Sequence, residues 1–129
     1  MYIGVDYGTK RVGIAVSDTN DKVAFPLKVI PESDALDCVH ELMKERKPQA
    51  IIVGESKDFK GKDNPLMKKI YQFIQELEKK TKVKVILEPE FLTSAQAAQG
   101  EGSAEMLDAS AAALILQSFL DKREPDTIV

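Results

Sequence analysis

The chain has 129 residues, of which 43% are hydrophobic and 30% charged, and its formal net charge at pH 7 is -3. This length and composition fit one domain that buries a core without disulfides or a structural metal, and they exclude a disordered chain. The longest unbroken apolar run, residues 111–116, is far too short to cross a membrane, and residues 1–8 enter a strand pattern directly, unlike a signal peptide. We therefore expect a soluble, cytoplasmic protein.

Three strands are predicted to open the chain. Small and β-branched side chains alternate through residues 1–6 and 11–17, and the turn DYGTKR between them contains Gly8, for which a positive φ costs little. This pattern predicts an antiparallel hairpin. Residues 23–30 form a third strand, which Pro26 places at an edge or a bulge because proline donates no ladder hydrogen bond.

Helices and strands alternate in the rest of the chain. An apolar stripe of helical period ends at Pro48, with Ser33 or Asp34 as its cap, and a second stripe runs from Leu66 to Leu77. Short apolar strands are predicted at residues 50–54 and 83–87, helices at 93–99 and 106–122, and a charged tail at 123–129. The order predicts a single α/β domain over residues 1–122. Its mixed five-stranded sheet would combine a three-stranded antiparallel meander with two parallel strands, flanked by helices and with the first strand near the centre.

Three acids stand where sites form in open α/β sheets, beyond the carboxyl ends of the parallel strands. Asp6 ends the first strand, Glu90 follows the last strand, and Asp108 opens the final helix. Taken singly, each acid also fits an ordinary structural role: Asp6 as a turn former, Glu90 as a surface acid and Asp108 as a helix cap. Gly4 shares the face of Asp6, and the final helix starts with small residues, so helix and sheet can approach closely and bring Asp108 near Asp6.

Converging carboxylates need a counterion, because a like-charged pair at 4 Å repels by about 4 kcal/mol at an effective dielectric constant of 20. Mg²⁺ or Mn²⁺ suits such hard oxygen ligands, and these ions can activate water and stabilise the leaving oxygen of a phosphodiester. The joint placement of Asp6, Glu90 and Asp108 therefore favours a site for divalent metal ions, and these three acids are the candidate metal ligands and catalytic residues.

Positive charge is concentrated in one window of the sequence. Residues 57–84 hold nine lysines against four acids, a net +5 that leaves -8 for the rest of the chain. A solvated lysine face and a phosphate-binding face both fit this window, and Arg11 can either bind phosphate or pair with an acid across the hairpin. The loop KDFKGK is the predicted substrate edge, where an aromatic side chain can stack on an unpaired base or pack on its own domain. The candidate substrate-binding residues are Lys10, Arg11, Lys57, Phe59, Lys60 and Lys62.

Four segments carry a resemblance to a known family. They are GVDYGTKRVGIAVSD (residues 4–18), AIIVGESKDFKGK (50–62), EFLTSAQAA (90–98) and LDASAAALILQSFLD (107–121). In this order they closely resemble the YqgF/RuvX family of Holliday junction resolvases. The resemblance implies a ribonuclease H-like fold and a metal-dependent nuclease acting on Holliday junction DNA or on the 5′ end of pre-16S rRNA. Asp6, Glu90 and Asp108 match the family's metal ligands, Arg11 matches its arginine after the Gly-Thr turn, and Thr93 matches the threonine of its Asp-Glu-Arg-x-Thr motif, which adds Thr93 to the substrate-binding candidates.

The chain departs from the family pattern in two places. Pro89-Glu90-Phe91 stands where the family has Asp-Glu-Arg, so an acid and a cation beside the expected metal site are absent. Glu88 replaces the missing acid if its side chain faces the site, which strand alternation leaves open. The family's Lys- and Arg-rich segment before the last helix is here the acidic QGEGSAEML, which should reduce phosphate affinity. A weak or specialised nuclease, and one that relies on a partner, both fit these departures.

Two other functions use a similar sequence. A non-catalytic nucleic-acid or ribosome-associated module with the same fold is compatible with Phe91 and the acidic loop. Actin-like ATPases also carry an Asp-x-Gly-Thr hairpin, but this chain is too short for their two lobes and lacks a second phosphate hairpin. A monomer and a homodimer are both compatible with the sequence, since a symmetric junction favours a dimer whereas trimming one RNA end does not require it.

Overall fold

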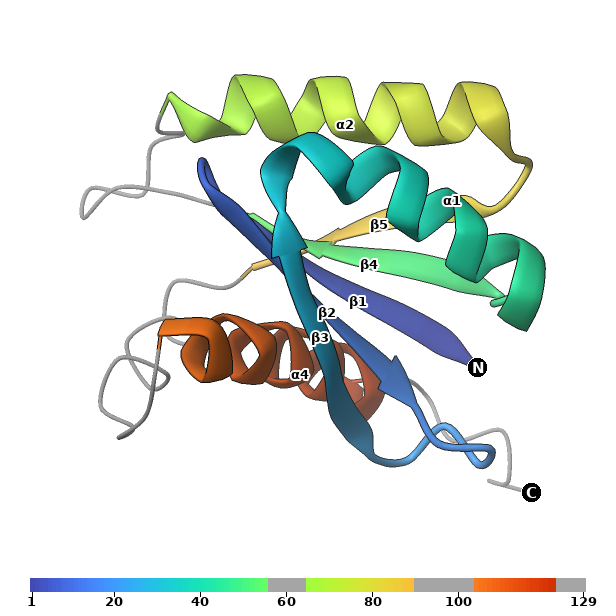
Figure 1. Cartoon of the computed structure of the whole chain (residues 1–129). Coiled ribbons are helices and arrows are strands. Elements are labelled where there is room, and N and C mark those ends of the chain that lie inside the picture. Colours follow the sequence, from blue (N-terminus) through green and yellow to red (C-terminus); the bar gives the residue numbers. More distant parts are fainter. Residues whose placement is uncertain (56–64, 90–103, 123–129) are drawn as a thin grey trace.

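The computed structural model describes residues 1–55, 65–89 and 104–122, with the side chains of the last range described from Ala111 onward (Figure 1). Five strands form one mixed sheet in the order β3-β2-β1-β4-β5. The first three strands are β1 (Tyr2–Tyr7), β2 (Arg11–Ser17) and β3 (Ala24–Pro31), which form the predicted antiparallel meander. The strands β4 (Ala50–Gly54) and β5 (Lys84–Glu88) add to β1 in parallel, so β1 lies at the centre, as predicted.

The edge position of β3 confirms the prediction from Pro26. The register of β2 against β3 shifts between Ile14, which pairs with Lys28, and Ala15, which pairs with Pro26. Leu27 is therefore the extra residue of a β-bulge. The proline sits at an irregular point of an edge strand, where its missing N–H costs least.

Gly8 serves the β1–β2 turn for a reason other than the one predicted. Its φ lies outside the positive range, so the expected left-handed conformation is wrong. Instead, the Gly8 N–H donates to the Arg11 carbonyl oxygen at 3.0 Å, and a Cβ added at Gly8 would lie 2.6 Å from that oxygen. Close approach of the two backbone segments is what requires glycine here.

Helices cover both faces of the sheet (Figure 1). The helices α1 (Ala35–Arg46) and α2 (Leu66–Lys80) lie on one face, and α4 (Ala104–Lys122) lies on the other. A short 3-10 turn, η1 (Glu32–Asp34), leads into α1, and no side-chain hydrogen bond caps α1 at Asp34, so the predicted cap is wrong. The helix ends at Arg46, and its C-cap Lys47 adopts the left-handed conformation directly before Pro48. No described helix is long and apolar enough to cross a membrane.

The central strand alternates between two apolar layers. Ile3, Val5 and Tyr7 face the layer that contains α1 and α2, whereas Tyr2 belongs to the layer that contains α4. Alternation therefore places Gly4 and Asp6 on the α4 face.

Helix α4 approaches the sheet closely at Gly4. A Cβ added there would lie 2.8 Å from the Cβ of Leu116 and 3.0 Å from the Ala112 carbonyl oxygen, which confirms the close approach predicted from the small residues. The Tyr2 and Phe119 rings meet edge to face at 5.2 Å. Because later residues of α4 contact earlier residues of β1, the helix runs antiparallel to the strand. Its amino-terminal half therefore lies toward the carboxyl end of β1, where Asp6 stands.

Candidate functional site

Asp6 lies half-buried near the carboxyl end of the central strand, on the face that α4 covers. Gly13 stands directly opposite on β2. The parallel register, in which Val5 pairs with Val53, places Gly54 beside Asp6 on β4. Two glycines therefore flank Asp6 on the sheet, so the adjacent positions of β2 and β4 place no side chain beside its carboxylate.

Glu88 extends the same row of residues. It pairs with Gly54 at the end of β5, and its backbone oxygen accepts a hydrogen bond from the Glu55 N–H at 2.8 Å. Glu88 is buried, and its side chain faces α4, where Ser118 Oγ donates to its Oε2 at 3.2 Å and Lys122 forms an ion pair with it. This answers the question that the sequence left open, because the carboxylate points to the face of Asp6. The carboxylate holds the end of α4 against β5 through Ser118 and Lys122. A buried carboxylate needs hydrogen-bonding or charged partners of this kind.

The hairpin cations lie at the same edge of the sheet. Lys10 is exposed in the turn between β1 and β2, and its carbonyl oxygen accepts a hydrogen bond from the Glu32 N–H at 2.9 Å. Arg11 is the exposed first residue of β2 and pairs with Pro31 of β3. Both cations therefore stand at the carboxyl edge of β1. This position is compatible with the predicted contact to substrate, which stays a prediction.

The structure does not describe the side chains of the remaining predicted site residues. Asp108 lies on α4, which begins four residues earlier at Ala104, so Asp108 does not open the helix as predicted and is not its cap. Its side chain falls outside the described set. The residues that lie wholly outside the described ranges are Lys57, Phe59, Lys60, Lys62, Glu90 and Thr93. Among the described residues, no group of three or more His, Cys, Asp or Glu is placed to hold a metal ion, so the convergence of Asp6, Glu90 and Asp108 stays a prediction.

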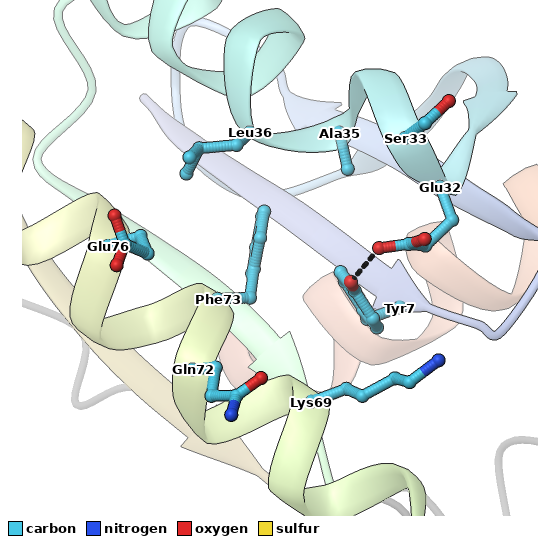
Figure 2. A pocket seen from close by; sticks show the side chains of 9 residues that line it. All are labelled: Tyr7, Glu32, Ser33, Ala35, Leu36, Lys69, Gln72, Phe73 and Glu76. Carbon is cyan, nitrogen blue, oxygen red and sulfur yellow. Dashed lines mark hydrogen bonds between the residues drawn. The ribbon is translucent and has the colours of Figure 1, made fainter.

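A pocket that sequence reasoning missed lies on the opposite face of the same sheet edge (Figure 2). It has a volume of about 280 Å³ and opens between the start of α1 and one side of α2. The signal in the sequence is the spacing of Lys69, Gln72 and Glu76, which line the same side of α2 as the buried Phe73. The residues that line the pocket are Tyr7, Glu32, Ser33, Ala35, Leu36, Lys69, Gln72, Phe73 and Glu76.

Tyr7 closes one end of this pocket. Its hydroxyl donates to Glu32 Oε2, and its ring contacts the ring of Phe73 with centroids 4.9 Å apart. Burial raises the pKa of the Tyr7 hydroxyl far above its usual value of 10, and the bond to Glu32 and the charge of that carboxylate raise it further. Tyr7 is therefore a protonated hydrogen-bond donor at neutral pH.

The fold and this edge define the class of protein. A central strand that ends in an acid, an antiparallel meander on one side, two parallel strands on the other and helices on both faces constitute a ribonuclease H-like domain. Solved structures agree. A Thermus thermophilus RuvC bound to a Holliday junction superposes with a TM-score of 0.58 at 18% identity, covering 94% of each chain. The fowlpox virus Holliday junction resolvase gives a TM-score of 0.58 at 15% identity, covering 95% of this chain and 99% of the viral one. At these identities the comparison shows the fold alone.

Sequence comparison identifies the family. The family model described as "RuvX: Holliday junction resolvase" matches residues 1–122. A protein of Nitratidesulfovibrio vulgaris is 34% identical over 134 residues, covering 95% of this chain and 94% of the relative. A protein of Amoebophilus asiaticus is 35% identical over 129 residues, covering 92% of each. Both are named "Putative pre-16S rRNA nuclease". The chain belongs to the RuvX family, as its motifs indicated.

Proposed function

We propose that this chain is a nuclease that depends on Mg²⁺ or Mn²⁺ and hydrolyses a phosphodiester of structured nucleic acid in the cytoplasm. The names of its relatives favour the 5′ end of pre-16S rRNA as the substrate, and the description of the family favours Holliday junction DNA. The observation that carries the proposal is the position of Asp6. A half-buried carboxylate between Gly13 and Gly54, at the carboxyl end of the central strand, supplies hard oxygen ligands at the sheet edge where sites form in α/β folds.

The donor set proposed for the metal is Asp6, Glu90 and Asp108. Two observations support it. The antiparallel course of α4 sets Asp108 one turn before Ala112, which packs over Gly4, and this turn lies on the side of Asp6. Glu88 ends β5 on the same face, two strands from Asp6, and Glu90 follows two residues later. Divalent ions bound by these carboxylates would activate water and stabilise the leaving oxygen.

The other proposed contacts are to phosphate. Lys10 and Arg11 are exposed at the edge beside Asp6, and charge-assisted hydrogen bonds from these side chains would hold a phosphodiester over that edge. Lys57, Lys60 and Lys62 would extend this contact along the strand. Phe59 and Thr93 complete the proposed substrate-binding set.

Asp6→Asn tests the proposal. The amide keeps the size of the side chain but is a poor ligand for a hard cation, so we expect a folded protein without cleavage activity. The measurement incubates parent and variant with a labelled four-way junction and with a pre-16S rRNA fragment, each in Mg²⁺ and in Mn²⁺. Circular dichroism confirms the fold. Asp37→Asn, an exposed change on α1, is the matched control and should cleave at the parental rate.

Equal cleavage by the parent and Asp6→Asn in Mn²⁺ would refute the assignment of Asp6. A parent that binds either substrate without cleaving it, and without taking up Mn²⁺ through Asp6, would instead identify a non-catalytic module. The substrate that is cleaved distinguishes RNA processing from junction resolution.

A further inference from the structure

The pocket beside Tyr7 has the size of one small ring system. Sites for drug-sized ligands begin at about 300 Å³, and this pocket measures about 280 Å³. Tyr7, Ala35 and Phe73 are buried and contribute apolar surface to it, and Leu36 is half-buried. A flat group with apolar faces would therefore be desolvated against these side chains.

The polar groups around the pocket favour a ligand with N–H donors and a negative charge. Glu32 and Glu76 accept hydrogen bonds, and Gln72 both donates and accepts. Lys69 is exposed, and no ion pair joins it to another residue in the described part of the chain. Lys69 and Glu76 are two helical turns apart on α2, about 10 Å along its axis, so these two groups lie at different ends of the pocket, whereas Glu32 lies toward the end of Lys69 (Figure 2).

The pocket and the proposed cleavage site are formed in part by two consecutive residues of β1. Asp6 and Tyr7 are consecutive residues of β1, with Cα atoms about 3.8 Å apart, and their side chains point to opposite faces of the sheet. A strand of nucleic acid that crosses this edge would pass both. On this path one nucleotide would lie at Asp6 and the base of another would enter the pocket.

We propose that this pocket binds one unpaired nucleobase of the substrate strand, with Lys69 contacting a phosphate of the same nucleotide. Base edges carry amino and imino N–H groups that carboxylates and amides accept, and base faces stack on aromatic rings. A cationic peptide side chain is the competing ligand, because two carboxylates and an aromatic ring would attract it. The positive charge of Lys69, which also lines the pocket, would repel such a ligand. The proposal rests on the proposed function for the source of the base, whereas the pocket itself is tested without cleavage.

The test is an NMR titration of the ¹⁵N-labelled Asp6→Asn variant, without divalent ions, with each of the nucleotides AMP, CMP, GMP and UMP. We expect saturable shifts at the backbone amides of Tyr7, Leu36, Gln72 and Phe73, larger for at least one base than for the others. Ribose 5-phosphate, which lacks a base, should leave these amides unchanged. Lys69→Gln should weaken nucleotide binding about tenfold, the loss of one charge-assisted contact. Lys68→Gln, an exposed neighbour outside the pocket, should change it less than twofold.

Three results would overturn the pocket proposal: no shifts at these amides with any of the four nucleotides, equal shifts with ribose 5-phosphate, or tighter binding of N-acetylarginine amide than of every nucleotide. The two proposals fail separately. A parent protein that cleaves neither junction nor rRNA, while the nucleotides still bind here, refutes the nuclease and keeps the pocket. A parent protein that cleaves, while no nucleotide binds at these amides, supports the nuclease and refutes the pocket.

Discussion

Gly4 determines how closely α4 approaches the central strand. An alanine there would place its methyl group 2.8 Å from the Leu116 Cβ and 3.0 Å from a backbone oxygen, so helix and sheet must separate. We predict that Gly4→Ala lowers the free energy of unfolding by about 1–3 kcal/mol, the usual cost of overpacking. Urea denaturation measures this difference. Gln75→Ala, an exposed change on α2, should shift it by less than about 0.5 kcal/mol. Unchanged stability in Gly4→Ala would mean that α4 is not fixed against β1.

At single residues, the sequence was informative where the size of a side chain limits how closely two elements can pack. The small residues at Gly4 and at the start of the last helix predicted a close approach that the structure confirms. Gly8 was identified as a turn residue, but its role comes from contact with Arg11 rather than from a positive φ. The direction and partners of Glu88 depend on a helix that contributes residues about thirty positions later, so strand alternation alone could not reveal them.

Among the elements, the last turn of α4 is fastened to the end of β5 by Lys122 and Ser118. The Lys122 side chain is 60% exposed and that of Glu88 is 5% exposed, so removing the lysine charge leaves a buried carboxylate with Ser118 alone. We predict that Lys122→Met destabilises the protein by about 1–2 kcal/mol, below the cost for a fully buried pair because water reaches the lysine. Lys80→Met, in the last turn of α2, is the matched control for thermal or urea denaturation.

The double variant Glu88→Gln/Lys122→Met separates charge from packing. A neutral amide still accepts the hydrogen bond from Ser118 and no longer needs a cation, so we expect it to recover most of the lost stability. If Lys122→Met is as stable as Lys80→Met, the ion pair does not fasten the helix.

The strands and helices were predictable because apolar residues repeat with the period of each element. The five strands, α1 and the start of α2 lie within about two residues of their expected positions, whereas α2 continues three residues beyond Leu77 and α4 begins two residues before its expected start. The cap of α1 was not predictable, because a 3-10 turn continuous with the helix replaces the expected side-chain bond. The spacing of Lys69, Gln72 and Glu76 indicates one wall of the pocket, but the pocket as a whole was not predictable, since its lining comes from β1, η1, α1 and α2 together.

For the molecule as a whole, the position of the cations matters more than the net charge of -3. Lys10 and Arg11 stand at the carboxyl edge of β1, whereas Lys79 and Lys80 end α2 at the opposite edge, shortly before β5 begins. We predict that Lys10→Gln/Arg11→Gln weakens binding of a pre-16S rRNA fragment and lowers the slope of log K against log salt by about 1.5, as expected for two lost phosphate contacts. Filter binding of Asp6→Asn proteins over a range of salt concentrations measures this slope.

The matched control for this prediction is Lys79→Gln/Lys80→Gln, which makes the same change in net charge. It should leave the salt slope near that of the parent. Equal effects of the two pairs would show that the nucleic acid responds to overall charge and that the carboxyl edge is not its binding site.

The alternation of side chains along β1 has an evolutionary consequence. Asp6 and its successor in the chain face separate layers of the fold, so substitutions around α1 and α2 can alter the proposed base pocket without touching the residues packed under α4. If both proposals hold, base preference and hydrolytic chemistry can evolve independently, and a designer can exchange the residues of one layer while leaving the other intact.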